Sequence, residues 1–154
     1  MRGAKTALVG GLAGLVLASG AGAATPRPEP ETFVRQAFAA AGEPAADQRA
    51  YLALFAPELR GLIQQDRRDG EVGALDYEPI CHCQDDDGLV LGALTVSGDA
   101  RAPVVEAEIV VPTAPPTIDR VVYSLAWVDG RWRIADIRVA GRPSLKAWLA
   151  RASR

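Results

Sequence analysis

The chain has 154 residues, a formal net charge of −2 and 49% hydrophobic residues. This length suits one domain with its own hydrophobic core. The mildly acidic balance argues against a nucleic-acid binder, because phosphates are held mainly by lysine and arginine.

The N-terminal residues have the pattern of a secretory signal peptide. Arg2 and Lys5 precede an apolar run rich in glycine and alanine from Ala7 to Ala18, and Ala21-Gly22-Ala23 offers an A-x-A cleavage site. The run is too short for a membrane span, which needs roughly 20 apolar residues. We therefore expect residues 1–23 to be removed and the mature protein to be periplasmic or secreted. Without Arg2 and Lys5, 15 basic residues face 19 acidic ones, so the mature net charge is −4.

The first part of the mature chain is predicted to be helical. Residues 24–30 hold three prolines and form an extended leader. Apolar residues at helical spacing then predict a helix from Glu31 to Ala41, ended by Gly42. A second helical stretch begins near Asp47 and restarts at Pro57, since helices accept proline in their first turn.

The second part is predicted to form strands. Residues of high β propensity fall into four runs, at Leu89–Ser97, Pro103–Val111, Ile118–Val128 and Trp132–Val139. In the first run Val90, Leu94 and Val96 are expected to share one face. In the third, the inner face is expected to carry Val121, Tyr123, Leu125 and Trp127.

Three local signals complete the fold. Asp129-Gly130 predicts a tight hairpin, because both central positions of such a turn need a positive φ. The alternation of the last strand slips near Ala135-Asp136, which predicts a β-bulge. Ser144 leads into a short C-terminal helix. The result is a single α+β domain over residues 31–154, with the N-terminal helices packed on a strongly curved four-stranded antiparallel sheet. Such a sheet would enclose a cone-shaped cavity able to hold a ligand.

The segment Asp76–Val90 joins the two parts and concentrates the reactive side chains. It contains both cysteines, the only histidine and the carboxylates of Asp85-Asp86-Asp87. Cys81 and Cys83 have three interpretations: a strained disulfide, which an exported protein favours, a zinc or copper site with His82, or small half-buried residues at the start of a strand. No second ligand pair accompanies the cysteines, so no metal site or cofactor is predicted.

Other candidate site residues follow from position. Asp76, Asp85 and Asp136 are the carboxylates that could act as a general base, and Tyr77 or Tyr123 could donate a proton or a hydrogen bond. Gln84 and Asp85 could bond the amides of the loop. Each of these has a simpler interpretation as a surface or turn residue, and no catalytic residue is assigned.

The segment Asp-Tyr-Glu-Pro-Ile-Cys-His-Cys-Gln-Asp, with Pro57-Glu58-Leu59 before it and the Trp127–Ile134 hairpin after it, resembles domain-of-unknown-function family 3828. The resemblance covers about residues 31–150. It implies an exported bacterial protein with the nuclear-transport-factor-2-like fold. It implies no activity, because that superfamily includes isomerases, dehydratases and non-enzymatic binding or dimerising modules.

These observations predict a non-enzymatic module that binds a small ligand or a protein, including a second copy in a homodimer. A rival hypothesis is a small isomerase-like or hydrolase-like enzyme with a carboxylate base in the cone cavity. A third is a redox or metal-handling protein that uses the Cys81-His82-Cys83 segment.

Overall fold

A computed structural model of the chain describes residues 27–42, 48–66, 73–84 and 88–153. Its helices are α1 (Pro30–Gly42), α2 (Gln48–Leu52), α3 (Pro57–Asp66) and α4 (Leu145–Ala152), and its strands are β1 (Val90–Asp99), β2 (Ala102–Val111), β3 (Thr117–Val128) and β4 (Arg131–Val139). The predicted α+β class, the four-stranded sheet and the short C-terminal helix are confirmed. The predicted signal peptide and Asp85 lie outside the described residues.

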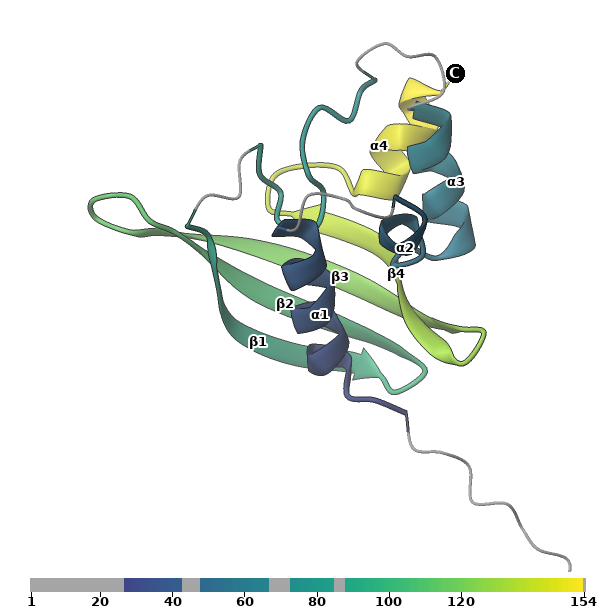
Figure 1. Ribbon diagram of the computed structural model, residues 1–154, viewed down its shortest axis with the longest axis horizontal. Coiled ribbons are helices and arrows are strands. Elements are labelled where there is room, and N and C mark those ends of the chain that lie inside the picture. The colour runs from purple at the N-terminus through teal and green to yellow at the C-terminus, as the bar shows by residue number, and fades with distance from the viewer. Residues whose placement is uncertain (1–26, 43–47, 67–72, 85–87, 154) are drawn as a thin grey trace, which may run out of the picture.

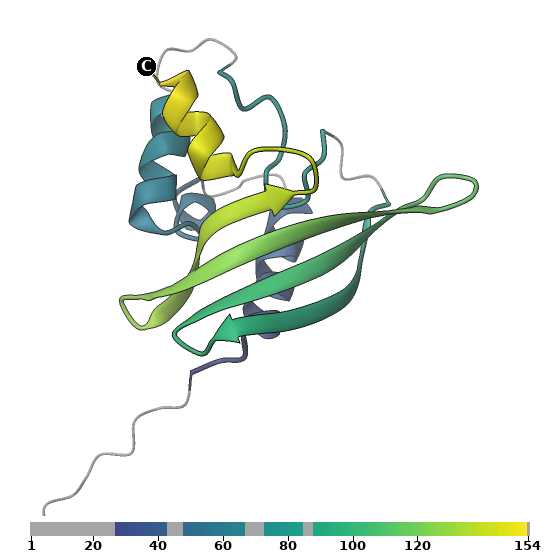
Figure 2. The same ribbon diagram turned by 180° about the vertical axis from the view of Figure 1, so that it is seen from behind.

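The strands form one antiparallel sheet in the order β1-β2-β3-β4. Figure 1 shows α1 crossing one face of this sheet, with α3 and α4 side by side near β4. Seen from behind in Figure 2, the opposite face has none of the four described helices over it. The sheet therefore has an inner face packed on helices and an outer face that the described residues leave uncovered.

Alternation along the strands builds the inner face. Val105, Ala107 and Ile109 of β2 are buried, and Val121, Tyr123 and Leu125 of β3 continue the layer. Because successive side chains of a strand point to opposite faces, the period-two pattern in the sequence places these residues together. The predicted inner face of β3 is confirmed.

Two local predictions at β4 are also confirmed. Asp129 has φ 50° and Gly130 has φ 73°, which is the geometry of the predicted hairpin turn. Ser124 pairs with Asp136 while Leu125 pairs with Ile134, so Ala135 is the extra residue of a bulge.

The predicted face of Val90 is wrong. A bulge between Leu91 and Leu94 shifts the alternation, so that Leu91 rather than Val90 shares the inner face with Leu94 and Val96. Val90 pairs with Val110 on the outer face and is 57% exposed. One extra residue in a strand turns every side chain beyond it to the other face.

The helical part is interrupted where β4 meets it. Residues 54–56 leave the helical conformation and run parallel to β4, because the Ala56 amide donates to the Ile134 carbonyl and the Ile134 amide donates to the Leu54 carbonyl, both at 2.8 Å. Pro57 then begins α3, as predicted. This pairing covers part of the outer edge of β4.

The core lies between the helices and the inner face. Phe55, Leu59 and Ile63 are fully buried there, and α4 adds Leu145 and Leu149. Among the described residues, every buried side-chain nitrogen or oxygen atom has a hydrogen-bond partner, as stable folds require. None of the described helices combines the length and the apolar character needed to cross a membrane.

Candidate binding site

Residues 78–83 form a small closed loop between the helices and the sheet. The Glu78 amide donates to the Cys83 carbonyl at 2.7 Å, and the Cys83 amide donates to the Glu78 carbonyl at 3.2 Å. Cys81 and Cys83 lie at disulfide-bonding distance, which agrees with the first of the three interpretations of this pair. His82 stands between them with φ 55°, a left-handed conformation that suits a tight turn.

Two tyrosines hold this loop against the core. The Tyr51 hydroxyl donates to Glu78 Oε1 at 2.6 Å, and the same oxygen accepts the Ile80 amide at 3.0 Å. The Tyr123 hydroxyl donates to the Ile80 carbonyl. Burial raises the pKa of Tyr123, and the charge of Glu78 adds to that effect, so the hydroxyl keeps its proton. Tyr123 therefore serves as a hydrogen-bond donor to the loop.

Glu78 is a functional candidate that sequence reasoning missed. It lies within the segment that drew attention, but its partner Tyr51 is 27 residues away. No local pattern marks such a pair. The carboxylate and tyrosine are within hydrogen-bond reach, yet the same carboxylate oxygen also bonds the backbone of its own loop, which indicates a structural role.

The other predicted residues of this segment divide into two groups. Tyr77 is half-buried and stacks on Trp148 with ring centroids 6.0 Å apart, and it forms a T-shaped pair with His82 whose ring centroids are 5.0 Å apart. Asp76 and Gln84 are exposed. The structure thus brings Tyr77 and Tyr123 to the loop but gives Asp76 and Gln84 no place in an enclosed site.

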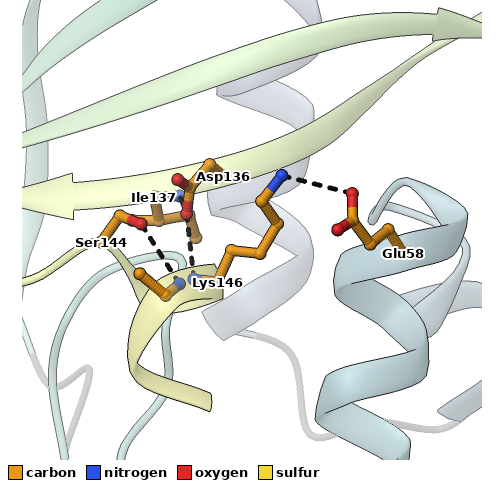
Figure 3. Close-up of polar contacts among 6 residues, drawn as sticks. Glu58, Asp136, Ile137, Ser144 and Lys146 are labelled. Atoms are coloured by element: carbon orange, nitrogen blue, oxygen red, sulfur yellow. Dashed lines mark hydrogen bonds and ion pairs between the residues drawn. The ribbon is translucent and has the colours of Figure 1, made fainter. Parts of the chain in front are cut away.

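Asp136 organises the start of α4. Its Oδ1 atom accepts the Ile137 amide at 2.9 Å and the Lys146 amide at 3.0 Å, as Figure 3 shows. Ser144 caps the same helix by accepting the Ala147 amide, and Lys146 Nζ pairs with Glu58 of α3 at 3.2 Å. A carboxylate oxygen that accepts two backbone amides is placed as a cap between β4 and α4.

A small pocket remains between the loop and the inner face. It has a volume of about 20 Å³ and is lined by residues that include Tyr77, His82, Ile137 and Arg142. This space suits a water molecule rather than a substrate. Burial lowers the pKa of His82, the nearby Arg142 lowers it further, and Asp119 opposes them, so the imidazole is neutral at pH 7.

A larger groove lies at the C-terminal end of β1, where the strand leads into the β1–β2 turn. Its volume is about 450 Å³, within the range of ligand sites. The walls come from the leader, the β1–β2 hairpin and the core tryptophan of β4, and the lining residues are Arg27, Pro28, Glu29, Pro30, Val96, Ser97, Gly98, Asp99, Ala100, Pro103 and Trp132. We call this space the Trp132 groove.

The leader forms one wall because it is anchored to β4. Trp132 Nε1 donates to the Pro28 carbonyl at 2.7 Å. The Arg27 guanidinium lies 4.9 Å from the Trp127 ring centroid and 5.8 Å from that of Trp132, which is within range of cation–π attraction. The sequence suggested an extended leader outside the core, and its three prolines gave no signal for this anchoring.

Among the described residues, no group of three or more histidine, cysteine, aspartate or glutamate side chains could hold a metal ion. Comparison of the chain with protein-family models, with curated proteins and with solved structures found no match.

Proposed function

We propose that this protein is an exported, non-enzymatic binding module and that the Trp132 groove is its binding surface. The observation that carries the proposal is the groove itself, which is about 450 Å³ in volume and has an indole and three prolines among its walls. Apolar walls with a few polar groups are the usual composition of a ligand site. The ligand is a small apolar molecule or a segment of a partner protein.

The arrangement of the predicted acid and base residues favours binding over catalysis. Asp136 bonds two backbone amides, and Tyr123 bonds the backbone of Ile80. A general base needs free access to the proton that it removes. These bonds support structural roles for both residues, and they weigh against an isomerase-like or hydrolase-like site built on them.

The Cys81–Cys83 pair is the feature that favours the redox alternative. Cys81 is only 5% exposed and Cys83 is half-buried, whereas a redox-active thiol is usually accessible to its partner. Burial therefore supports a structural disulfide in this loop.

Export, the nuclear-transport-factor-2-like cone and membership of family 3828 are part of the same proposal. They are supported by the signal-peptide pattern of residues 1–23 and by the segment from Asp76 to Asp85. A homodimer through the outer face of the sheet is supported by Val90, Val110 and Ile118, which are neighbours across three strands. Val90 and Ile118 are 57% and 56% exposed.

The groove can be tested by filling it. Ala100 lines the groove and is exposed in the β1–β2 turn, so Ala100→Phe should obstruct the groove without disturbing the core. Ala140 is also exposed, in the turn after β4, and does not line the groove, which makes Ala140→Phe the matched control.

The readout is the indole N–H signal of Trp132 in NMR spectra during screening with a fragment library and a library of short peptides. We expect ligands that shift this signal, leave that of Trp148 in place, bind the Ala140→Phe variant and fail to bind Ala100→Phe. If no compound shifts the Trp132 signal, or if Ala100→Phe binds as well as the wild type, the proposal is wrong.

A further inference from the structure

Within the described part of the chain, the outer edge of β1 carries a row of backbone groups without partners. β1 is the first strand of the sheet and, of the described strands, pairs only with β2. In an antiparallel pair, residues alternate between pairs that exchange both backbone hydrogen bonds and pairs that exchange none. Pro103 has no amide hydrogen, so Gly98 and Pro103 form a pair that exchanges no backbone hydrogen bonds. The pairs Val96–Val105 and Leu94–Ala107 lie two and four residues further along β2, so they also exchange none.

The backbone N–H and C=O groups of Leu94, Val96 and Gly98 therefore point away from β2. Among the described residues, none of these groups has a hydrogen-bond partner outside the sheet. Unpaired groups of this kind are a template for another strand.

The two edges of the sheet differ in how they are protected. The β4 edge is paired with residues 54–56 and carries Arg131, Arg133 and Arg138. β1 has no lysine, arginine or proline, and its only charged residue is Asp99 at the end. Proteins usually protect a free edge with charges, proline or a covering segment, and from Leu94 to Gly98 β1 has none of these among the described residues.

The same stretch of β1 forms a wall of the Trp132 groove. Val96 and Gly98 line the groove, and Val96 is on the inner face because it pairs with the buried Val105. A strand added to β1 would continue the inner face, so every second side chain of that strand would point toward the groove.

We propose that the Trp132 groove recognises an extended peptide segment of another protein, which adds as a fifth strand along Leu94–Gly98. The inference rests on the proposed binding function and specifies its ligand class and mode. Backbone hydrogen bonds to β1 supply affinity, and the groove selects the side chains.

The groove also indicates which side chains the peptide carries. Trp132, Pro28 and Pro103 favour an apolar residue. Glu29 and Asp99 lie on the groove without an ion pair among the described residues, whereas Arg27 is held over the two tryptophan rings. The two carboxylates outnumber the one guanidinium, so the groove has a negative net charge. The peptide therefore has a lysine or arginine beside its apolar residue.

The test selects a binding peptide from a displayed library of short random sequences and measures amide hydrogen exchange with and without the synthetic peptide. We expect the amides of Leu94, Val96 and Gly98 to become protected in the complex. Those of Thr95, Ser97 and Asp99, which face β2, should change little and serve as internal controls.

A pair of variants tests the same backbone contact. Val96→Pro removes an amide that β2 does not use, and edge positions tolerate proline, so the peptide should bind at least about tenfold more weakly. Val96→Thr changes the same groove-lining side chain but keeps the amide, so it should bind at least about threefold more tightly than Val96→Pro; equal losses in the two variants would contradict the backbone contact.

Each other outcome is decisive. If the selected peptide is sensitive to Ala100→Phe but leaves the amides of Leu94, Val96 and Gly98 unprotected, the groove binds ligands and strand addition is wrong. If no peptide is selected although fragments bind the groove, peptide recognition is wrong. If the three amides are already protected without peptide, in proportion to protein concentration, the edge pairs with a second copy and the proposal is also wrong.

Discussion

Trp132 donates a hydrogen bond from Nε1 to the carbonyl of Pro28, and this contact joins β4 to the leader across 104 residues of sequence. The indole is 4% exposed, so the bond is largely shielded from water. It makes the leader a structural part of the groove rather than a free tail.

Trp132→Phe should release the leader while keeping an aromatic side chain in the core. We expect the free energy of unfolding to fall by about 1–3 kcal/mol, because a hydrogen bond and packing are both lost. The Phe33 amide, which bonds the leader carbonyl of Glu29 at 3.3 Å, should exchange faster. Urea unfolding and hydrogen exchange measure both effects. Trp127→Phe is the control, since Trp127 contacts Arg27 but makes no bond to Pro28, and an equal effect there would refute the role of the indole bond.

The two tyrosines at the loop should differ in their contribution to stability. Tyr123→Phe leaves the buried Ile80 carbonyl without its side-chain donor, at a cost of about 1–3 kcal/mol. Tyr51→Phe should cost less, about 1 kcal/mol, because Glu78 Oε1 still accepts the Ile80 amide. Urea unfolding of the two variants gives the order, and a larger loss for Tyr51→Phe would contradict this assignment.

Asp136 should act through its acceptor oxygen rather than through its charge. Asp136→Asn keeps an oxygen for the Ile137 and Lys146 amides and should lower the free energy of unfolding by less than about 1 kcal/mol. Asp136→Ala removes both bonds and should lower it by about 1–2 kcal/mol, with faster exchange of the Lys146 amide. Thermal or urea unfolding decides the matter, and equal losses for the two variants would show that charge matters most.

His82 should make the fold less stable in mild acid. Burial and Arg142 lower its folded pKa, so below about pH 6.5 the unfolded chain binds the proton more readily than the folded chain. The free energy of unfolding should therefore decrease as the pH falls through that value, until the folded histidine is also protonated. His82→Gln should remove this part of the pH dependence.

The same histidine offers a direct spectroscopic measurement, because it is the only one in the chain. An NMR titration should give a pKa below 6.5 that rises in Arg142→Gln and falls in Asp119→Asn. Arg138→Gln is the control, since Arg138 is exposed on β4 and does not contribute to the shift. A His82 pKa that is the same in Arg142→Gln as in the wild type would refute the electrostatic cause.

Local patterns predicted much of the sheet. The alternation along the third strand placed Val121, Tyr123 and Leu125 correctly on the inner face, and Asp129-Gly130 marked its turn. These signals depend on neighbours within a few residues, so one sequence contains them. Val90 was misplaced because a bulge also depends on the partner strand, which periodicity does not reveal.

The candidate site depended on contacts that no local pattern records. Tyr51 meets Glu78, and Trp132 meets Pro28, over separations of 27 and 104 residues. The Trp132 groove exists only when the leader, the β1–β2 hairpin and β4 come together. Asp136, which was predicted as a site residue, instead caps the start of α4.

The pairing of residues 54–56 with Ile134 has a consequence for the order of assembly. The segment that leads into α3 cannot complete its hydrogen bonds until β4 is present, although β1, β2 and β3 separate it from β4 in the sequence. Contacts between such distant residues slow folding, because the intervening chain must be ordered first. During synthesis from the N-terminus, residues 54–56 therefore emerge long before β4, the strand with which they pair. The contact of residues 54–56 with Ile134 therefore forms only after the last strand of the sheet has been made.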